Sequence, residues 1–210
     1  MATMTSSERP LLESEKRLLR CALANQRKRL RDLRRRILII GGTIVAILWG
    51  VTLADSKNGP SWYVSGLFWL AIGVLLGFWC YWDARRDILR VLNRFESATR
   101  RNQARVVQVQ SEQMVEFEEQ EDEGACYAFQ ADPDRVVFVA GQAFYADRRF
   151  PNSDFSLVDV LTEDDTVAMF LIAKRGTKIE PIRTIPVEVR SKLKVPRHLE
   201  AVEGSLDRLE

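Results

Sequence analysis

Few residues of this 210-residue chain have the types and spacing that catalysis or metal binding requires. The chain has one histidine, His198, and its three cysteines at positions 21, 80 and 126 form no Cys-x-x-Cys pair. A Ser/His/Asp arrangement, a histidine-rich metal site and a zinc site of paired cysteines therefore lack their ligands. His198 has no acidic or cysteine partner in its motif, so we expect a surface residue on a C-terminal helix. We predict no enzyme activity, no catalytic residue, no cofactor and no metal.

Acidic residues gather in two places. Residues 116–123 contain six carboxylates, and Asp159 with residues 163–165 forms a second group. The first run lacks EF-hand spacing, which needs a central glycine and a distal bidentate glutamate. Paired carboxylates in the second group could perform acid–base chemistry, but turns commonly carry Asp for local hydrogen bonding. We interpret the first run as a solvated loop between strands.

Aromatic and guanidinium groups come together between Gly141 and Pro151. The four candidate residues for partner binding are Phe144, Tyr145, Arg148 and Arg149. Such groups suit recognition of a peptide or an acidic ligand. The alternative is that the aromatic residues belong to the core and lie beside an exposed loop.

Two segments without any charged residue dominate the first half of the chain. Residues 37–54 number 18 and residues 62–82 number 21. At about 1.5 Å per residue they extend about 27 and 31 Å, close to the ~30 Å hydrocarbon core of a bilayer. We predict two transmembrane helices joined by a short external loop, residues 55–61, in a helical hairpin. The alternative, two core helices of a soluble domain, is disfavoured because such helices rarely lack every charge.

Basic residues flank both apolar segments on the sides away from the loop. Residues 16–36 contain ten Lys and Arg side chains and residues 85–101 contain six, whereas the loop has Lys57 alone. Positive charge resists translocation, so we expect both termini in the cytoplasm and a location in an inner or plasma membrane. Five arginines beside the bilayer are expected to contact anionic lipid head groups: Arg34, Arg35, Arg36, Arg85 and Arg86.

The segments outside the apolar stretches, residues 1–36 and 83–104, place apolar residues at three/four spacing among arginines. This spacing predicts basic amphipathic helices that extend the hairpin into the cytoplasm. They could form a lipid-facing collar or a short coiled coil, or act only as a topology signal. We expect no nucleic-acid binding, because stacking aromatic residues are absent there. Residues 1–8 are expected to be a frayed end.

Small residues recur at every fourth position of the first apolar segment and on one face of the second. In lipid they allow helices to approach closely. We therefore predict that the hairpin packs through two small-residue faces, formed by Gly42, Ala46, Gly50 and Ala54 and by Gly66, Gly73 and Gly77. Dimerisation through the same faces, giving a homo-oligomer, is the alternative.

Beyond residue 105 the apolar pattern changes to short alternating stretches separated by turn residues. Six or seven strands at this spacing predict a small antiparallel barrel or sandwich over residues 105–210. Pro186 and Pro196 introduce two short helical segments, and the second has an apolar stripe formed by Leu199, Val202, Leu206 and Leu209. The order of elements is similar in outline to pleckstrin-homology-like barrels, a resemblance that implies binding of lipid head groups, peptides or proteins.

The charge of the two halves differs sharply, with +11 over residues 1–105 and −9 over residues 106–210. The sequence thus predicts an α+β membrane protein with a two-helix transmembrane hairpin, basic helical extensions and an acidic cytoplasmic β-rich domain. We expect it to act as an anchor, scaffold or accessory subunit, with anionic lipid and other membrane or cytoplasmic proteins as partners. Two alternatives stay open: a membrane-anchored enzyme with its site in the β domain, and an oligomeric channel formed by the hairpins.

Overall fold

The computed structural model describes residues 3–55, 61–120, 122–190 and 198–208. Within these ranges the side chains of Thr3 and of residues 51–65 are not described. The chain divides into two compact units. The helical unit consists of Leu11–Asn102 with Thr162–Ala168, and the β unit consists of Met1–Pro10, Gln103–Leu161 and Met169–Glu210. A helical part together with largely antiparallel sheets confirms the predicted α+β class.

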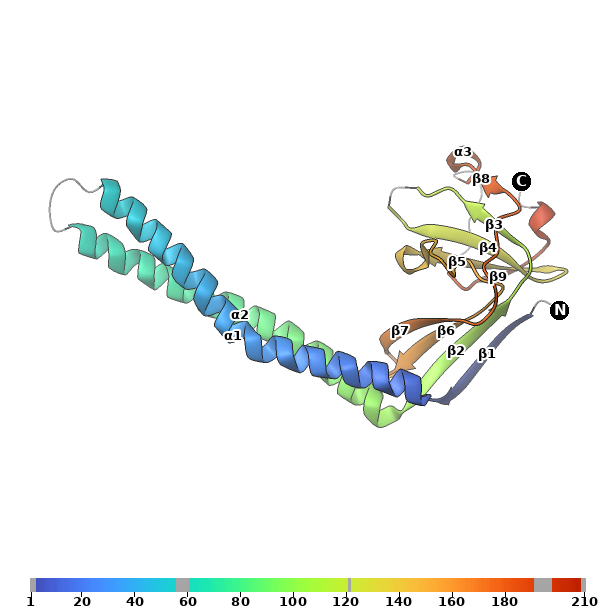
Figure 1. Ribbon diagram of the computed structural model, residues 1–210, viewed down its shortest axis with the longest axis horizontal. Helices are drawn as coiled ribbons and strands as arrows, with labels where there is room; N and C mark the ends of the chain where they lie inside the picture. Colours follow the sequence, from blue (N-terminus) through green and yellow to red (C-terminus); the bar gives the residue numbers. More distant parts are fainter. Residues whose placement is uncertain (1–2, 56–60, 121, 191–197, 209–210) are drawn as a thin grey trace. The chain divides into compact units, whose positions relative to one another are not determined.

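Two long helices, α1 (Glu13–Asp55) and α2 (Ser61–Arg101), lie side by side in the helical unit (Figure 1). Before α1, the backbone N–H of Leu12 donates to Glu15 Oε2 at 2.8 Å, which satisfies a donor that the helix leaves open. After α2, Asn102 adopts a left-handed conformation with φ 56° and donates to the Ala98 carbonyl at 3.0 Å. Asparagine tolerates this conformation better than most residues, so it ends the helix here.

Apolar residues of the predicted basic helices are buried in the first part of α1 and the last part of α2. They are Leu19 and Leu23 of α1 and Leu92 and Ala98 of α2. Arg27 of α1 also donates to Glu96 Oε1 of α2 at 2.9 Å on the exposed surface. The three/four spacing therefore predicted correctly that these segments are amphipathic helices with a buried stripe.

The N-terminal residues are not a frayed end or a helix, as the sequence had suggested. Residues Thr3–Pro10 form strand β1, which pairs antiparallel with β2 (Gln103–Gln110) in a register from Thr3↔Gln110 to Pro10↔Gln103. Met4 packs against the core, while most of the strand is exposed. A strand at a sheet edge needs few apolar residues, because the neighbouring strand supplies its hydrogen bonds. The helix predicted for residues 1–36 therefore begins at Glu13.

The β unit contains two sheets, which face one another (Figure 1). The four-stranded sheet has the order β1-β2-β6-β7 and the five-stranded sheet β8-β3-β4-β5-β9. The remaining strands are β3 (Met114–Phe117), β4 (Ala125–Asp132), β5 (Arg135–Gly141), β6 (Asp154–Leu161), β7 (Val167–Lys174), β8 (Thr184–Ile185) and β9 (Ala201–Glu203). Pairs β2–β6, β3–β4, β4–β5 and β5–β9 are antiparallel, and β3–β8 is parallel.

The core of the β unit lies between the two sheets and is rich in aromatic rings. Phe129 of β4 contacts Phe155 of β6 with ring centroids 5.1 Å apart, and Phe150 lies 5.4 Å from Phe155. The other face of β4 and β5 forms a second cluster, in which Phe138 packs with Leu206. Because successive strand residues point to opposite faces, β4 and β5 contribute to both clusters and are buried on both sides.

The C-terminal region differs from the predicted apolar helix. Within the described residues it contains α3 (Val187–Arg190), β9 and the short 3₁₀ helix η2 (Leu206–Arg208). Leu199 has φ 61°, and its backbone N–H donates to the Phe138 carbonyl of β5. The chain then continues along β5 as the edge strand β9. Leu206 is buried but Val202 is 37% exposed, so the predicted stripe is not one helical face. Leu209, its fourth member, lies outside the described residues. The described C-terminal residues therefore do not form the closing helix of a pleckstrin-homology-like barrel.

Candidate functional site

One described segment, Gly66–Arg101 of α2, has the length and apolar composition needed to cross a membrane. The predicted second span, residues 62–82, overlaps it. The predicted first span, residues 37–54, lies in α1, but the side chains of its last four residues are not described. The predicted packing residue Ala54 is one of these four. Most of the predicted external loop also lies outside the described residues.

Large apolar side chains on α1 and α2 are exposed and form what we call the apolar belt. Its members are Leu38, Ile39, Ile40, Ile44, Ile47, Leu67, Phe68, Leu70, Val74, Leu75, Leu76, Phe78 and Trp79. Their exposed fractions range from 51% to 69%. A helix pair of a soluble protein normally presents polar residues on its outer faces, so a continuous belt of this kind requires an apolar environment or a partner.

The glycines of α2 lie against α1. A Cβ at Gly73 would overlap Val45 Cγ2, one at Gly66 would lie 2.8 Å from Trp49 Nε1, and one at Gly77 would lie 3.9 Å from Ile37 Cγ2. These glycines therefore allow close approach of the two helices, as small residues do in membranes.

The small residues of α1 do not match the prediction. A Cβ at Gly42 or Gly50 would meet no atom within 4 Å, and Ala46 is exposed. The residues of α1 that contact the α2 glycines are Ile37, Val45 and Trp49. They belong to a stripe with the same four-residue spacing that lies on the neighbouring face. Dimerisation through the Gly42 face stays a prediction.

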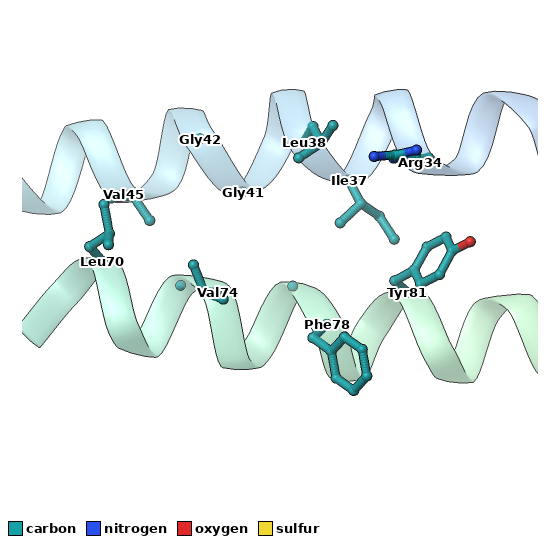
Figure 2. A pocket seen from close by; sticks show the side chains of 12 residues that line it. Arg34, Ile37, Leu38, Gly41, Gly42, Val45, Leu70, Val74, Phe78 and Tyr81 are labelled. Carbon is teal, nitrogen blue, oxygen red and sulfur yellow. The ribbon is translucent and has the colours of Figure 1, made fainter.

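A groove of about 560 Å³ runs between α1 and α2 (Figure 2). Apolar side chains and four glycines line most of it, including Gly41, which faces open space. Arg34 of α1 and Tyr81 of α2 lie at one end, and Val45 and Leu70 lie at the other (Figure 2). The groove is therefore apolar along its length and polar at one mouth.

The arginines predicted to contact lipid head groups lie near the two mouth residues, Arg34 and Tyr81, in the sequence. Arg34, Arg35, Arg36 and Arg86 are exposed and Arg85 is half-buried. Of these five, Arg34 lines the groove. Arg35 and Arg36 follow it by one and two positions, so they occupy other faces of α1.

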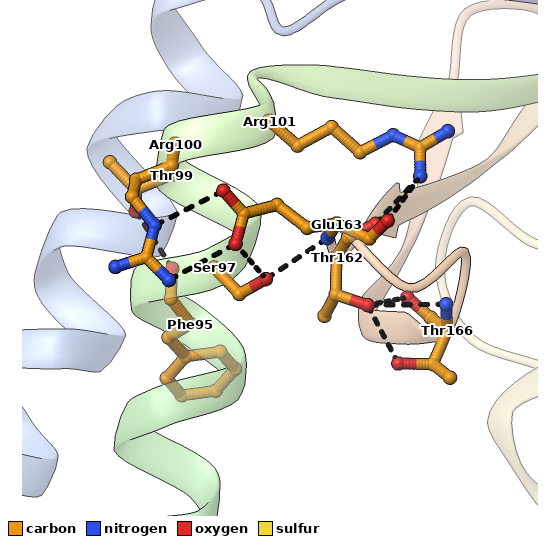
Figure 3. Close-up of polar contacts among 8 residues, drawn as sticks. All are labelled: Phe95, Ser97, Thr99, Arg100, Arg101, Thr162, Glu163 and Thr166. Atoms are coloured by element: carbon orange, nitrogen blue, oxygen red, sulfur yellow. Dashed lines mark hydrogen bonds and ion pairs between the residues drawn. The ribbon is translucent and has the colours of Figure 1, made fainter.

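A polar network joins the end of α2 to the Thr162–Ala168 segment of the same unit (Figure 3). Glu163 accepts hydrogen bonds from Arg100 Nε at 3.2 Å and Nη2 at 3.1 Å, and its backbone N–H donates to Ser97 Oγ at 2.9 Å. The Arg100 guanidinium lowers the pKa of Glu163, with a smaller contribution from Ser97. Asp165 pairs with Arg101. The Glu163 carboxylate is therefore held ionised by Arg100, which does not suit a proton donor.

Asp159, the remaining member of that acidic group, lies in β6 of the β unit. Burial raises its pKa, and Arg105 partly opposes this effect. A raised carboxyl pKa alone does not define a catalytic site, since structural burial has the same effect.

Most of the acidic run 116–123 lies in the loop between β3 and β4 with exposed carboxylates, as predicted, but several of its members are also bound within the β unit. Glu119 Oε1 accepts from the Gly124 N–H at 3.0 Å and from the Tyr145 hydroxyl at 2.6 Å. Arg190, which is 7% exposed, donates to Glu123 Oε2 and to the Glu118 carbonyl, both at 2.8 Å. The run therefore folds around a buried guanidinium.

Of the four predicted partner-binding residues, Phe144 belongs to the core. It is 3% exposed and its ring lies 5.9 Å from Phe150, so the core interpretation was correct for this residue and the binding prediction was wrong. Tyr145, Arg148 and Arg149 are exposed on the adjoining loop. The hydrogen bond to Glu119 raises the pKa of Tyr145, and Arg149 Nη2 donates to the Lys174 carbonyl at 2.9 Å.

His198 is exposed, as predicted, but it lies in a turn and has specific contacts. Its Nδ1 accepts a hydrogen bond from the Ala140 N–H at 3.2 Å, and its ring lies 5.0 Å from Phe144. Desolvation lowers the pKa of His198, and Asp159 opposes this shift. No signal in the sequence pairs His198 with β5, because the two are far apart along the chain.

The described residues contain no group of three or more His, Cys, Asp or Glu side chains that could hold a metal ion. No protein-family model, curated protein or solved structure matches the chain.

Proposed function

We propose that the chain is a two-pass membrane protein whose helical hairpin anchors a cytoplasmic β unit that binds other proteins. It would serve as an anchor, scaffold or accessory subunit of a membrane assembly. The observation that carries this proposal is the apolar belt, whose exposed side chains lie on both α1 and α2.

The belt favours two crossings, because it involves both helices. On α1 it begins at Leu38, two residues after Arg36, and on α2 it ends at Trp79, before Asp83. The apolar run of α1 continues to residue 54 in the sequence, which gives about 27 Å of helix. A helix of this length needs only slight thinning of the bilayer to cross a ~30 Å hydrocarbon core.

The orientation rests on charge. The arginines lie at the ends of the belt away from the connecting loop, and the loop itself has one lysine. The positive-inside tendency therefore supports cytoplasmic termini and a cytoplasmic β unit.

A binding role for the β unit is supported by the character of its polar groups. Its carboxylates contact backbone N–H groups, a tyrosine hydroxyl or a buried arginine, as in Glu119 and Glu123. Tyr145, Arg148 and Arg149 remain exposed on one loop, where tyrosine and arginine are the residue types most enriched at protein interfaces. We therefore favour this loop as the partner-binding surface over an enzyme site.

A channel formed by the hairpins has less support. Thr43, a polar residue of the first apolar segment, donates to the Ile39 carbonyl of its own helix at 2.8 Å. Its hydroxyl donor is therefore already used within α1, which does not suit a pore lining.

Two measurements on the full chain test the proposal. Membranes from expressing cells are washed with alkaline carbonate, and we expect the protein to stay in the pellet and to float with lipid. Release into the supernatant would contradict membrane insertion. Partners captured in mild detergent should be lost from the triple variant Tyr145→Ala, Arg148→Ala, Arg149→Ala and kept by Arg135→Ala, a substitution of an exposed arginine in β5. Equal capture by both variants would exclude this loop as the binding surface.

A further inference from the structure

We propose that the groove between α1 and α2 binds one anionic phospholipid of the cytoplasmic leaflet. An acyl chain would lie along the groove, and the phosphate would bind at the mouth formed by Arg34 and Tyr81. This proposal rests on the membrane location proposed above and adds a discrete site to the general attraction between arginines and anionic lipid.

Missing side chains create the groove. Gly41, Gly42, Gly73 and Gly77 all line it, and a Cβ at Gly41 would meet no atom within 4 Å. Toward the other end the helices touch, because Gly73 packs directly against Val45. The groove is therefore open beside Gly41 and narrows where the helices meet.

The length of the groove matches one leaflet. Val45 lies eight residues beyond Ile37, which corresponds to about 12 Å along α1. In the proposed topology, Ile37 is the first residue of the apolar run, so the groove extends from the cytoplasmic boundary toward the bilayer centre. Half of a ~30 Å hydrocarbon core is about 15 Å, the depth that the acyl chains of one leaflet fill. An acyl chain that enters at the boundary can therefore lie in the groove over most of the depth of one leaflet.

The charge at the mouth specifies the head group. Arg34 brings a permanent positive charge and several N–H donors from α1, and Tyr81 brings a hydroxyl from α2 on the opposite side of the mouth (Figure 2). A guanidinium binds phosphate oxygens with two parallel hydrogen bonds, and basic pockets between transmembrane helices at the cytoplasmic side suit anionic head groups. An anionic phospholipid offers both required parts, an acyl chain for the apolar length and a negative phosphate for the mouth.

The test uses the full chain reconstituted with dioleoylphosphatidylglycerol and dioleoylphosphatidylcholine in equal amounts. Lipid retained after mild detergent exchange is counted by native mass spectrometry. We expect one retained phosphatidylglycerol per chain. Arg34→Gln should reduce the preference for phosphatidylglycerol about fivefold, which corresponds to about 1 kcal/mol for one basic group near an anionic head group. Arg29→Gln, which removes an exposed charge of α1 outside the groove, should leave the retained lipid nearly unchanged.

A second pair of variants tests the groove itself. Gly41→Leu places a side chain in the open part of the groove and should reduce retention of both lipids at least fivefold. Gly50→Leu adds the same side chain where the structure also has open space, but outside the groove, and should retain lipid as the wild type does. Circular dichroism of all four variants in detergent verifies that the helices are intact.

Three outcomes would overturn the proposal. Equal losses in Arg34→Gln and Arg29→Gln would mean that lipid binds to a diffuse basic collar. Normal retention by Gly41→Leu would mean that the groove is not the site, and a dimer with no retained lipid would mean that a second copy covers it. In each case a chain that still floats with liposomes would leave the proposed membrane location intact, whereas a chain that does not float would contradict both.

Discussion

The contact between Gly73 and Val45 predicts that two similar glycine-to-alanine substitutions have different effects. In Gly73→Ala the new methyl group would overlap Val45 Cγ2, a side chain with restricted rotation. Overpacking of this kind costs about 1–3 kcal/mol. In Gly50→Ala the methyl group meets no atom within 4 Å, and alanine favours a helix over glycine by up to about 1 kcal/mol. Gly73→Ala should therefore destabilise the hairpin and Gly50→Ala should not.

The assay is unfolding of the full chain in mixed micelles with increasing sodium dodecyl sulfate, followed by far-ultraviolet circular dichroism and tryptophan fluorescence. A cost of 1–3 kcal/mol corresponds to about a 5- to 150-fold change in the folding equilibrium constant. Val45→Ala removes the overlapping methyl groups, so the double variant should recover part of the loss. Equal stability of Gly73→Ala and Gly50→Ala, or no coupling between positions 45 and 73, would refute this packing.

The remaining predictions concern the β unit. Asn152 is fully buried and binds the backbone of Arg149, Gly176 and Asp154 through four hydrogen bonds. Asn152→Ala should therefore lower the free energy of unfolding by about 1–3 kcal/mol for each group left unsatisfied. A urea midpoint equal to that of the wild type would contradict this prediction. The hydrogen bond from Lys174, aided by backbone N–H groups, lowers the pKa of Asp147 to about 2. The ionised carboxylate therefore stabilises the folded state above the ordinary carboxyl pKa, and this stabilisation is lost as the pH falls toward 2. An NMR titration should show this pKa rise toward about 4 in Lys174→Met, and an unchanged value would exclude the ion pair as its cause. The pKa of His198 is lowered, so neutral His198 stabilises the fold fully above about pH 6.5, and this stabilisation is lost as the pH falls. His198→Gln should remove this part of the pH dependence of the free energy of unfolding. An identical pH profile of unfolding in the variant and the wild type would refute the assignment.

Several features of the fold were predictable because they depend on local spacing. The helical unit follows from apolar residues at three/four spacing, as Leu19 and Leu92 show by their burial. Strands β4 and β5 follow from β-branched and aromatic residues between turns. Strand β1 was missed because Thr3–Pro10 has no alternating pattern and forms a strand only beside β2, about 100 residues later in the sequence.

The helix contact shows a second limit of sequence reasoning. Two stripes of α1 have the same four-residue spacing: one contains Ile37, Gly41 and Val45, and the other contains Gly42, Ala46 and Gly50. Neighbouring helix positions differ by about 100° in direction, so the choice between the stripes decides which face meets α2. Residue size favoured the wrong stripe, because the contact pairs a large residue on α1 with a glycine on α2.

The candidate site was predictable in charge but not in shape. The positions of Arg34–Arg36 and of Arg85 and Arg86 indicate a basic region beside the apolar segments. The mouth formed by Arg34 and Tyr81 depends on the pairing of two helices and has no signature in either segment alone. Phe144 illustrates the opposite error, since aromatic residues beside arginines are as common in a core next to a loop as in a binding surface.

The most direct test of the two-pass account is the accessibility of single cysteines to a membrane-impermeant maleimide in intact cells. The three native cysteines, two exposed and one buried, are first replaced with serine or alanine. Ser56→Cys lies between the two predicted spans, and Asp134→Cys lies on an exposed turn of the β unit. The account predicts labelling of Ser56→Cys in intact cells and labelling of Asp134→Cys only after permeabilisation. Labelling of Asp134→Cys in intact cells, or of Ser56→Cys only after permeabilisation, would contradict it.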